Sequence, residues 1–277
     1  MNPIISIAKK EIMDNIRNKW VIIITIIFAA LAILVSYAGS LFSQGWQDLS
    51  LTIAGMSTLV QYIVTIIALI LGYSTIIGEI EKGSMNSLLS LSTTRLEVLI
   101  GKIVGLGIIL SFSIFIGFGL AGIIIGLNVP DPNFGEYILF IFASIFMGLI
   151  FLSLGILLSC AFKKRSSAMG GAIFLWIFYA IIWIFISAGL LVASIDLSNI
   201  ESLNIPDWYY AIQFLNPAGS YGGLVSLNFA TGQTGIGEIP EMIYPSFYTN
   251  EVMIIAGLIW FIVPFLLSYI IFNRRDI

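Results

Sequence analysis

Long apolar runs alternate with short polar segments along the whole chain. Six of these runs are nearly free of charge and have about 20 or more residues, the length that a helix needs to cross the hydrocarbon core of a bilayer. They are Val21–Leu41, Met56–Ile77, Val98–Leu127, Tyr137–Phe162, Ala168–Val192 and Val252–Phe272. The pattern predicts an all-α membrane protein with six spans in a single domain, residues 1–277. The third run is long enough to be tilted or to extend beyond the bilayer.

Polar residues mark the points where two of these helices begin. Thr94 and Glu97 have the spacing of a capping box ahead of the third span, and Asn133 and Glu136 have it ahead of the fourth. In such a box each residue satisfies a backbone N–H group that the first turn of a helix leaves unpaired. We therefore expect a helix start at each site.

The segment before the first span, residues 1–20, predicts an amphipathic helix. Apolar residues recur there at spacings of three and four: Ile5, Ala8, Ile12, Ile16 and Trp20. Polar residues occupy the other faces: Lys9, Lys10, Asp14 and Arg17. Such a helix lies in the membrane interface, with Trp20 as an anchor at its exit. Because acids and bases are mixed before the first apolar run, we do not expect a signal peptide.

The second span carries a stripe of small and polar residues at spacings of three and four. Its members are Thr58, Gln61, Thr65, Ala68, Gly72 and Thr75. Small residues let helices pack closely in lipid, so simple packing accounts for such a stripe. A dimer seam or a substrate path is the alternative, favoured by Gln61 because an amide in lipid needs a partner. The third span holds seven glycines, which predict close packing: Gly101, Gly105, Gly107, Gly117, Gly119, Gly122 and Gly126.

The basic residues indicate the orientation of the chain. Hydrophobic residues make up 59% of the sequence and charged ones only 10%, and the mean hydropathy is +1.04. With six spans, all 12 Lys and Arg residues fall on one face: Lys9, Lys10, Arg17, Lys19, Lys82, Arg95, Lys102, Lys163, Lys164, Arg165, Arg274 and Arg275. The other face carries only acids: Asp48, Asp131, Glu136, Asp196, Glu201, Asp207, Glu238, Glu241 and Glu251. The positive-inside rule places the basic face and both termini in the cytoplasm, with the chain in the inner membrane.

Composition excludes several kinds of chemistry. One cysteine, Cys160, and no histidine argue against a disulfide framework, a multi-thiolate metal site and a histidine proton relay. Lys102 is counted with the polar segment before the third span, so no span is expected to hold an ionisable group. Ion-coupled carriers usually have such a group inside a span, so the sequence argues against a carrier of that class. There is no phosphate-binding GxxxxGK[ST] loop. We therefore expect no enzyme activity, no cofactor and no nucleic-acid partner, with energy supplied by another polypeptide.

The polar stretch "GEIEKGSMNSLLSLSTTRLEVLIGK", residues 78–102, separates the second and third spans. Gly78 is expected to end the second span, and Gly83 with Ser84 to break and restart the helix, with Ser84 as a cap. A short helix then presents an apolar ridge made of Met85, Leu88, Leu89 and Leu91. This ridge suits docking into a groove of a soluble partner, while the alternative is a helix that rests among lipid headgroups.

The same stretch resembles the first cytoplasmic loop of ABC-2-type permeases. Their pattern is matched by Glu79, Glu81, Gly83, Ser84, Leu88, Leu89, Arg95, Gly101 and Lys102. The N-terminal segment "IAKKEIMDNIRNKW" resembles the amphipathic elbow helix of this family. The segments "KKRSSAMGGAIFLW", "FLNPAGSY" and "YIIFNRRDI" resemble its NosY-like branch, which is named for the permease of the nitrous-oxide-reductase maturation system. Many family members have a proline before the arginine, where this chain has Ser92-Thr93-Thr94. This chain therefore departs from the family pattern in the turn before Arg95.

The resemblance implies a permease subunit of an ATP-driven exporter. Two copies of the chain would work with two cytoplasmic ABC ATPase subunits, which would bind the ATP and Mg²⁺. Residues 1–20 would be an elbow helix and residues 78–97 the coupling loop, with the ATPase contacted by Glu79, Glu81, Lys82, Gly83, Ser84, Leu88, Leu89 and Arg95. In the family, spans two and five border the central seam, which fits Thr58, Gln61, Thr65, Gly72 and Thr75.

The cargo and the outer partner are open at this point. The acidic and aromatic segment 193–250 is expected outside the membrane, with Trp208, Tyr209 and Tyr210 at the interface and Asn216 capping a helix from Pro217. It serves either as a lid or as a dock for an extracytoplasmic accessory protein. The branch suggests copper- or sulfur-related metalloenzyme maturation. Export of a lipid, drug or peptide, and a non-transporting membrane anchor or signalling subunit for an ATPase, are the alternatives.

Overall fold

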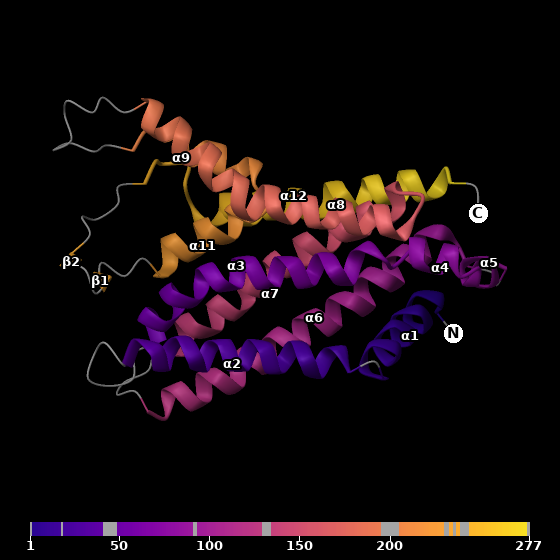
Figure 1. Cartoon of the computed structure of the whole chain (residues 1–277), viewed down its shortest axis with the longest axis horizontal. Coiled ribbons are helices and arrows are strands. Elements are labelled where there is room, and N and C mark those ends of the chain that lie inside the picture. Colours follow the sequence, from indigo (N-terminus) through magenta and orange to yellow (C-terminus); the bar gives the residue numbers. More distant parts are fainter. Residues whose placement is uncertain are drawn as a thin grey trace.

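The chain is a bundle of long helices that run side by side (Figure 1). The computed structural model describes residues 2–17, 19–40, 49–90, 93–128, 134–194, 205–229, 233–234, 237–238 and 244–275. The long helices are α2 (Trp20–Ser40), α3 (Leu49–Tyr73), α6 (Arg95–Gly126), α7 (Phe134–Ala161), α8 (Arg165–Ile177) continued by α9 (Trp183–Ser194), and α12 (Asn250–Asn273). Each of the six predicted apolar runs corresponds to one of these helical segments, so the all-α fold class is confirmed.

Shorter elements lie at the two ends of the bundle. At one end are α1 (Pro3–Arg17), α4 (Ile77–Glu81) and α5 (Ser84–Leu89), and α12 also ends there (Figure 1). We call this the basic end, because the described Lys and Arg residues gather on the elements that meet there. The segment before α12 contains α10 (Asp207–Ile212), the 3-10 turn η3 (Gln213–Leu215), α11 (Gly219–Phe229) and a pair of two-residue strands, β1 (Gln233–Thr234) and β2 (Gly237–Glu238).

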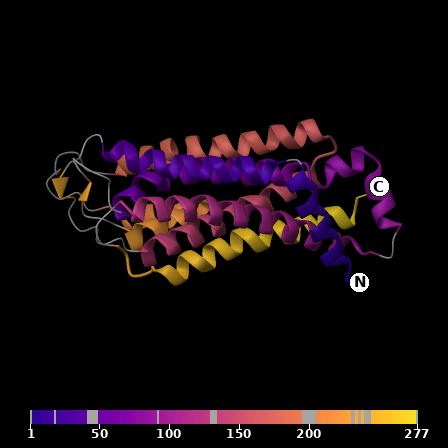
Figure 2. The ribbon, with the colours of Figure 1, turned by 90° about the horizontal axis from the view of Figure 1, so that it is seen from below.

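Five helical segments of the described chain are by themselves long and apolar enough to cross a membrane. They comprise α3 with α4, α6, α7, α8 with α9, and α12. Helix α2 meets the same test only as a pair with α1, from which it is bent by 67°. Figure 2 shows α1 crossing the end of the bundle at an angle to the long helices. The count is therefore five spans, or six when the bent pair is taken as one.

Helix α7 lies at the centre of the packing. It packs along α3, α6 and α12, while α2 packs along α6 on the other side. The backbones of α3 and α7 approach closely at Gly72 and Gly155: a Cβ atom added to Gly72 would lie 2.9 Å from the Cα of Gly155. Close packing by the α6 glycines is confirmed for most of them; Gly117, for example, lies directly against Phe28 of α2. Gly119 differs, since a Cβ atom there would meet nothing within 4 Å.

The capping box at the start of α6 is confirmed. The Glu97 backbone N–H donates to the Thr94 hydroxyl (3.2 Å), and the Thr94 backbone N–H donates to the Glu97 carboxylate (2.7 Å). Asn133, the first half of the other predicted box, lies outside the described residues. The remaining half, Glu136, is in the first turn of α7.

Two boundary predictions in the polar stretch are wrong. Helix α3 ends at Tyr73, and Gly78 lies inside α4 rather than at the end of the span. Gly83 does break the helix, since its φ of 73° is the left-handed conformation that glycine adopts without strain. However, Gly83 itself holds the N-cap position of α5, and the Ser84 hydroxyl donates back to the Glu79 carbonyl (3.3 Å) instead of capping.

The close approach of α3 and α7 predicts unequal effects of two glycine substitutions. Gly72→Ala forces its methyl group against the backbone of α7, and overpacking of this kind costs about 1–3 kcal/mol. Gly119→Ala places the same methyl group in open space, so we expect no loss of stability. Thermal unfolding midpoints of both variants in lipid nanodiscs test this difference. Equal midpoints for the two variants would contradict the close contact.

Candidate functional site

Four charged side chains form an ion-pair network at the basic end. The Lys102 ammonium in α6 lies 2.6 Å from the Glu11 carboxylate in α1 and 3.1 Å from the Glu79 carboxylate in α4. The other oxygen of Glu79 lies 2.9 Å from the Lys10 ammonium in α1. The Lys102 side chain is only 1% exposed. This network, made of Lys10, Glu11, Glu79 and Lys102, joins α1 to α4 and α6, with contacts that span 69 and 91 positions of the sequence.

The burial of Lys102 follows from the way α1 lies on α6. A Cβ atom added to Gly101 would lie 2.7 Å from the Cβ of Ile7, and one added to Gly105 would lie 2.8 Å from the Ala8 carbonyl oxygen. The two glycines therefore let α1 rest directly on the surface of α6, with Ile7 and Ala8 buried in the contact. Between the glycines, Lys102 is covered by α1.

This arrangement corrects one expectation, which concerns Lys102. Lys102 does not belong to a solvated loop but to the second turn of α6, so the prediction that no span holds an ionisable group is wrong at this end of α6. The helix predicted for residues 1–20 is present as α1, and Ile5 and Ile16 of its apolar stripe are 62% and 54% exposed. They lie on the face turned away from the bundle, while Ile7 and Ala8 bind it to α6. The place of α1 in the membrane interface stays a prediction.

The network is balanced in charge. Removing a single ammonium group from water costs several kcal/mol, and the attraction of nearby carboxylates offsets that cost only when the geometry is good. Here the Lys102 ammonium has two carboxylates within 3.1 Å. Removing one partner of such a pair is destabilising by about 3–5 kcal/mol, because a charge is then left buried and uncompensated. The three helices are thus held in a defined relative position.

Arg95, at the start of α6, binds the last turn of α12. Its guanidinium Nη1 donates to the carbonyl oxygens of Phe272, Asn273 (3.1 Å) and Arg275 (2.7 Å). The guanidinium also lies over the Phe272 ring, 5.4 Å from its centroid. The Phe272 carbonyl also accepts the Arg275 backbone N–H (3.3 Å). Carbonyls at the end of a helix carry the negative end of its dipole, so a cation is favourable there.

Similar contacts join the ends of α4, α7, α8 and α12. Arg275 donates to the carbonyl oxygens of Cys160 (3.1 Å) and Phe162 (2.9 Å) at the end of α7. The Glu81 carboxylate accepts the backbone N–H of Arg165 (2.7 Å) at the start of α8. The Ser159 hydroxyl of α7 accepts the first backbone N–H groups of α4 (2.8 and 3.0 Å). Side chains from neighbouring helices therefore satisfy many of the helix ends here.

The structure divides the predicted ATPase-coupling residues into two groups. Glu79, Glu81 and Arg95 point to other helices of the same chain, as described above. Lys82 and Gly83, in the turn between α4 and α5, are exposed, and so is Ser84, the first residue of α5. In α5, Leu88 and Leu89 are half-buried against the core of the bundle and Met85 is fully buried. Met85 of the predicted ridge thus faces inward, and Leu91 lies outside the described residues.

The predicted stripe on α3 is also divided. Thr65 and Thr75 are buried, and their hydroxyls donate to backbone carbonyls of α3 itself, at Gln61 (2.5 Å) and Leu71 (2.8 Å). Gly72 is buried against α7. Nearer the start of α3, Thr58 is exposed and Gln61 is half-exposed. Packing within the chain therefore accounts for the buried part, and a seam or path through Thr58 and Gln61 stays a prediction.

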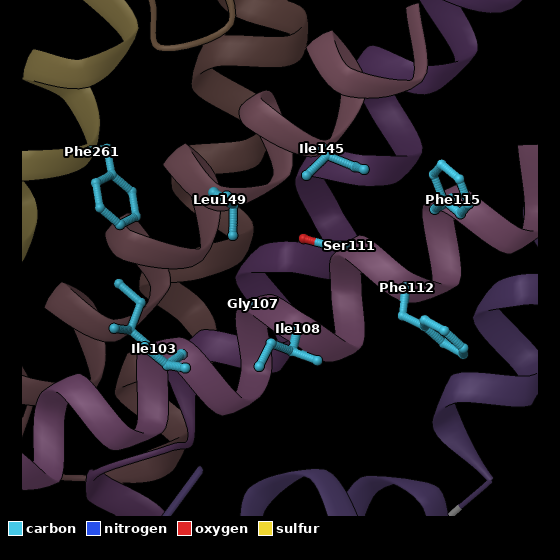
Figure 3. A pocket seen from close by; sticks show the side chains of 10 residues that line it. Ile103, Gly107, Ile108, Ser111, Phe112, Phe115, Ile145, Leu149 and Phe261 are labelled. Atoms are coloured by element: carbon cyan, nitrogen blue, oxygen red, sulfur yellow. The ribbon is translucent and has the colours of Figure 1, made fainter. Parts of the chain in front are cut away.

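An open hollow lies between α6, α7 and α12 (Figure 3). It has a volume of about 550 Å³ and is lined by Ile103, Val104, Gly107, Ile108, Ser111, Phe112, Phe115, Ile145, Leu149 and Phe261. Ser111 brings the one hydroxyl group among these side chains. Such a surface suits hydrocarbon and offers no charged group that would select a polar cargo.

At the end opposite the basic end, the chain turns back into the bundle. The turn from η3 to α11 buries Asn216 and Ala218. The Asn216 side chain accepts the Ala218 backbone N–H (2.9 Å) and donates to the Tyr179 carbonyl (3.2 Å). Tyr179 belongs to η1 (Phe178–Ile182), a π-helical turn between α8 and α9. The helix that follows Asn216 begins at Gly219, two residues later than predicted.

An aromatic cluster covers this turn. Tyr244 and Tyr248 stack with ring centroids 5.1 Å apart, and Tyr210 packs edge-on against both. Burial raises the pKa of Tyr210 and of Tyr248, so both phenols are neutral at physiological pH. Tyr210 is thus a packed residue rather than a membrane anchor, while Trp208 is 38% exposed. The choice between a lid and a dock stays open.

Apolar helices with an ordered set of charges at one end define a multi-pass membrane subunit, and comparisons identify its family. A sequence model described as "ABC-2 family transporter protein" matches residues 5–277. The chain therefore belongs to the ABC-2 transporter family.

Two curated relatives are both named "Probable ABC transporter permease protein NosY". The one from Stutzerimonas stutzeri is 32% identical over 286 aligned positions, which cover 99% of each chain. The one from Pseudomonas aeruginosa is 32% identical over 235 positions, or 80% of this chain and 86% of the relative. The chain is thus a NosY-like permease subunit of an ABC transporter, and the predicted resemblance is confirmed.

Sequence reasoning missed the partners of Lys102 and the role of Arg275. The relevant signal was the spacing of Gly101 and Gly105 on either side of Lys102. Two glycines four residues apart indicated that another helix lies on that face, but not which helix. Glu11 could be assigned only once α1 was placed.

The contacts of Arg95 predict a local effect at the end of α12. Arg95→Ala leaves carbonyl groups of the last turn without their charged partner, and each such hydrogen bond contributes about 1.5–3 kcal/mol. We expect the backbone amides of residues 270–275 to exchange with deuterium at least about tenfold faster. Arg274→Ala, at an exposed position on the same turn, is the control. If both variants exchange alike, Arg95 does not hold this helix end.

Proposed function

We propose that two copies of this chain form the membrane part of an ABC exporter and that two separate ATPase subunits bind at its basic end. The observation that carries this proposal is the position of α4 and α5. They lie at the far end of the bundle (Figure 2), and Glu79 and Glu81 join them to α1, α6 and α8. A force applied to this segment reaches several spans directly.

The orientation in this proposal places the basic end in the cytoplasm. Support comes from the described basic residues on α1, α4, α6, the α7–α8 turn and the end of α12, which meet at one end of the bundle (Figure 1). Cytoplasmic segments of inner-membrane proteins carry such an excess of Lys and Arg. The two termini and the coupling loop, residues 78–97, would then face the ATPase.

In this proposal the chain carries out no covalent chemistry, and ATP with Mg²⁺ is bound by the partner ATPase. Closure of the ATPase dimer shifts the spans only if the two states of the permease bind it with different affinity. The NosY-like resemblance favours a copper- or sulfur-containing cargo that is used in metalloenzyme maturation. It also favours an extracytoplasmic accessory protein that binds at the end opposite the basic end. Export of a lipid, drug or peptide is the alternative.

Substitutions in α5 test the binding of the ATPase. Leu88→Asp with Leu89→Asp places two charges on the half-buried side of this short helix. We expect permease-stimulated ATP hydrolysis to fall to the rate of the ATPase alone, measured with the reconstituted complex in nanodiscs. Asn86→Asp, at an exposed position of the same helix, adds a charge without altering the leucines. Unchanged ATP turnover in a folded double variant would exclude a coupling role for α5.

A substitution in α3 separates a seam or path role of Gln61 from simple packing. Gln61→Leu removes the half-exposed amide of the predicted seam or path and keeps the side-chain volume nearly constant. We expect a change of at least about twofold in ATP hydrolysis by the complex, because a path residue contributes to the coupling between sites. Thr75→Val, within the buried part of the stripe, is the comparison. Wild-type rates for Gln61→Leu would favour packing alone.

A further inference from the structure

The ion-pair network connects the coupling segment to helices that it barely touches through its backbone. Helix α4 packs mainly against α5, α7 and α8. Its link to α1 and α6 is the Glu79 carboxylate, which lies 2.9 Å from Lys10 and 3.1 Å from Lys102. Lys102 in turn lies 2.6 Å from Glu11. Glu79 thus provides the ion pairs that link α4 to α1 and α6.

We propose that Lys102 is a positioning residue for ATP coupling: through Glu79 and Glu11 it makes α1, α6 and the α4–α5 segment move as one body when the ATPase acts. This inference rests on the proposed function. It means that α1 moves together with the α4–α5 segment when the ATPase acts, in addition to anchoring the chain in the membrane interface.

The geometry supports a shared movement of the three helices. The Lys102 side chain is 1% exposed, and those of Glu11 and Glu79 are 12% and 17% exposed. With so little water at the site, a carboxylate that moves away from Lys102 cannot be replaced by solvent without opening the contact between α1 and α6. That contact is tight, because α1 rests on Gly101 and Gly105. The lowest-energy movement is therefore one that keeps all three groups together.

The charged residues next to the network, Glu81 and Arg95, bind other helices and take no part in its ion pairs. Glu81, two residues after Glu79, accepts the backbone N–H of Arg165 at the start of α8. Arg95, at the start of α6, binds the carbonyls of α12. Movement of α4 is thus transmitted through Glu79 to α1 and α6, and through Glu81 to α8.

A set of matched variants distinguishes positioning from simple stabilisation. Lys102→Met leaves two buried carboxylates without their shared partner, so both thermal stability and coupling are expected to fall. The triple variant Glu11→Leu, Glu79→Leu and Lys102→Met replaces the buried charges by apolar side chains, which restores stability in many proteins. It lacks the directional contacts, however. We expect its unfolding midpoint to recover while permease-stimulated ATP hydrolysis stays about tenfold below wild type.

Movement of α1 is measured directly in the same complexes. Spin labels are placed at Lys9→Cys on α1 and Asn86→Cys on α5, two exposed positions, and Cys160 is buried. We expect the distance between the labels to stay unchanged in the wild-type background when the ATPase is trapped with ATP and vanadate. In the triple variant the same treatment should shift this distance, because α5 moves without α1.

The outcomes separate this inference from the proposed function. Lys163→Met, which removes an exposed lysine in the α7–α8 turn, controls for the loss of a positive charge. If the wild-type chain fails to stimulate the ATPase, the proposed function is wrong. If the wild type stimulates it and the triple variant does so equally, with the same label distances, the network is structural only and the inference is overturned.

Discussion

An ammonium group can stay inside a bundle of apolar helices only when carboxylates surround it, and this constraint shapes the basic end of the protein. Lys102 requires Glu11 and Glu79 at the same time. Glu11 reaches it only if α1 lies flat on α6, which in turn requires glycine at 101 and 105. Glu79 reaches it only if α4 follows α3 as a separate short helix. One buried charge thus determines the relative positions of three elements.

The other helix ends at this face obey the related rule that buried backbone groups need partners. The carbonyls at the ends of α7 and α12 are bound by Arg275 and Arg95, and the N–H groups at the starts of α4 and α8 by Ser159 and Glu81. Because each contact comes from a different helix, the ends form a continuous layer. By contrast, in each of the spans α8–α9 and α12 only 17% of the most apolar 18-residue stretch is buried within the chain. The exposed surface of these two spans is free to contact lipid or a second copy.

The sequence predicted what depends on local pattern and missed what depends on how helices meet. Apolar length gave the helical segments, and the spacing of Thr94 and Glu97 gave a correct cap. The end of α3 was misplaced because α4 continues the apolar pattern after a three-residue break that carries no strong sequence signal. Lys102 was assigned to a loop because its burial depends on α1, about ninety residues earlier in the chain. The orientation of Met85 likewise depends on tertiary packing.

The π turn η1 has a consequence for the register of the fifth long helical segment. A π turn accommodates one extra residue, which offsets the side chains beyond it by about 100° from those of an unbroken α-helix. Directly after the turn, the Trp183 indole donates to the Gln213 side chain (3.1 Å), and within the turn the Tyr179 carbonyl accepts from Asn216. A single-residue deletion within 178–182 would turn the far half of the segment away from α10 and η3, even if every remaining residue kept its chemical character.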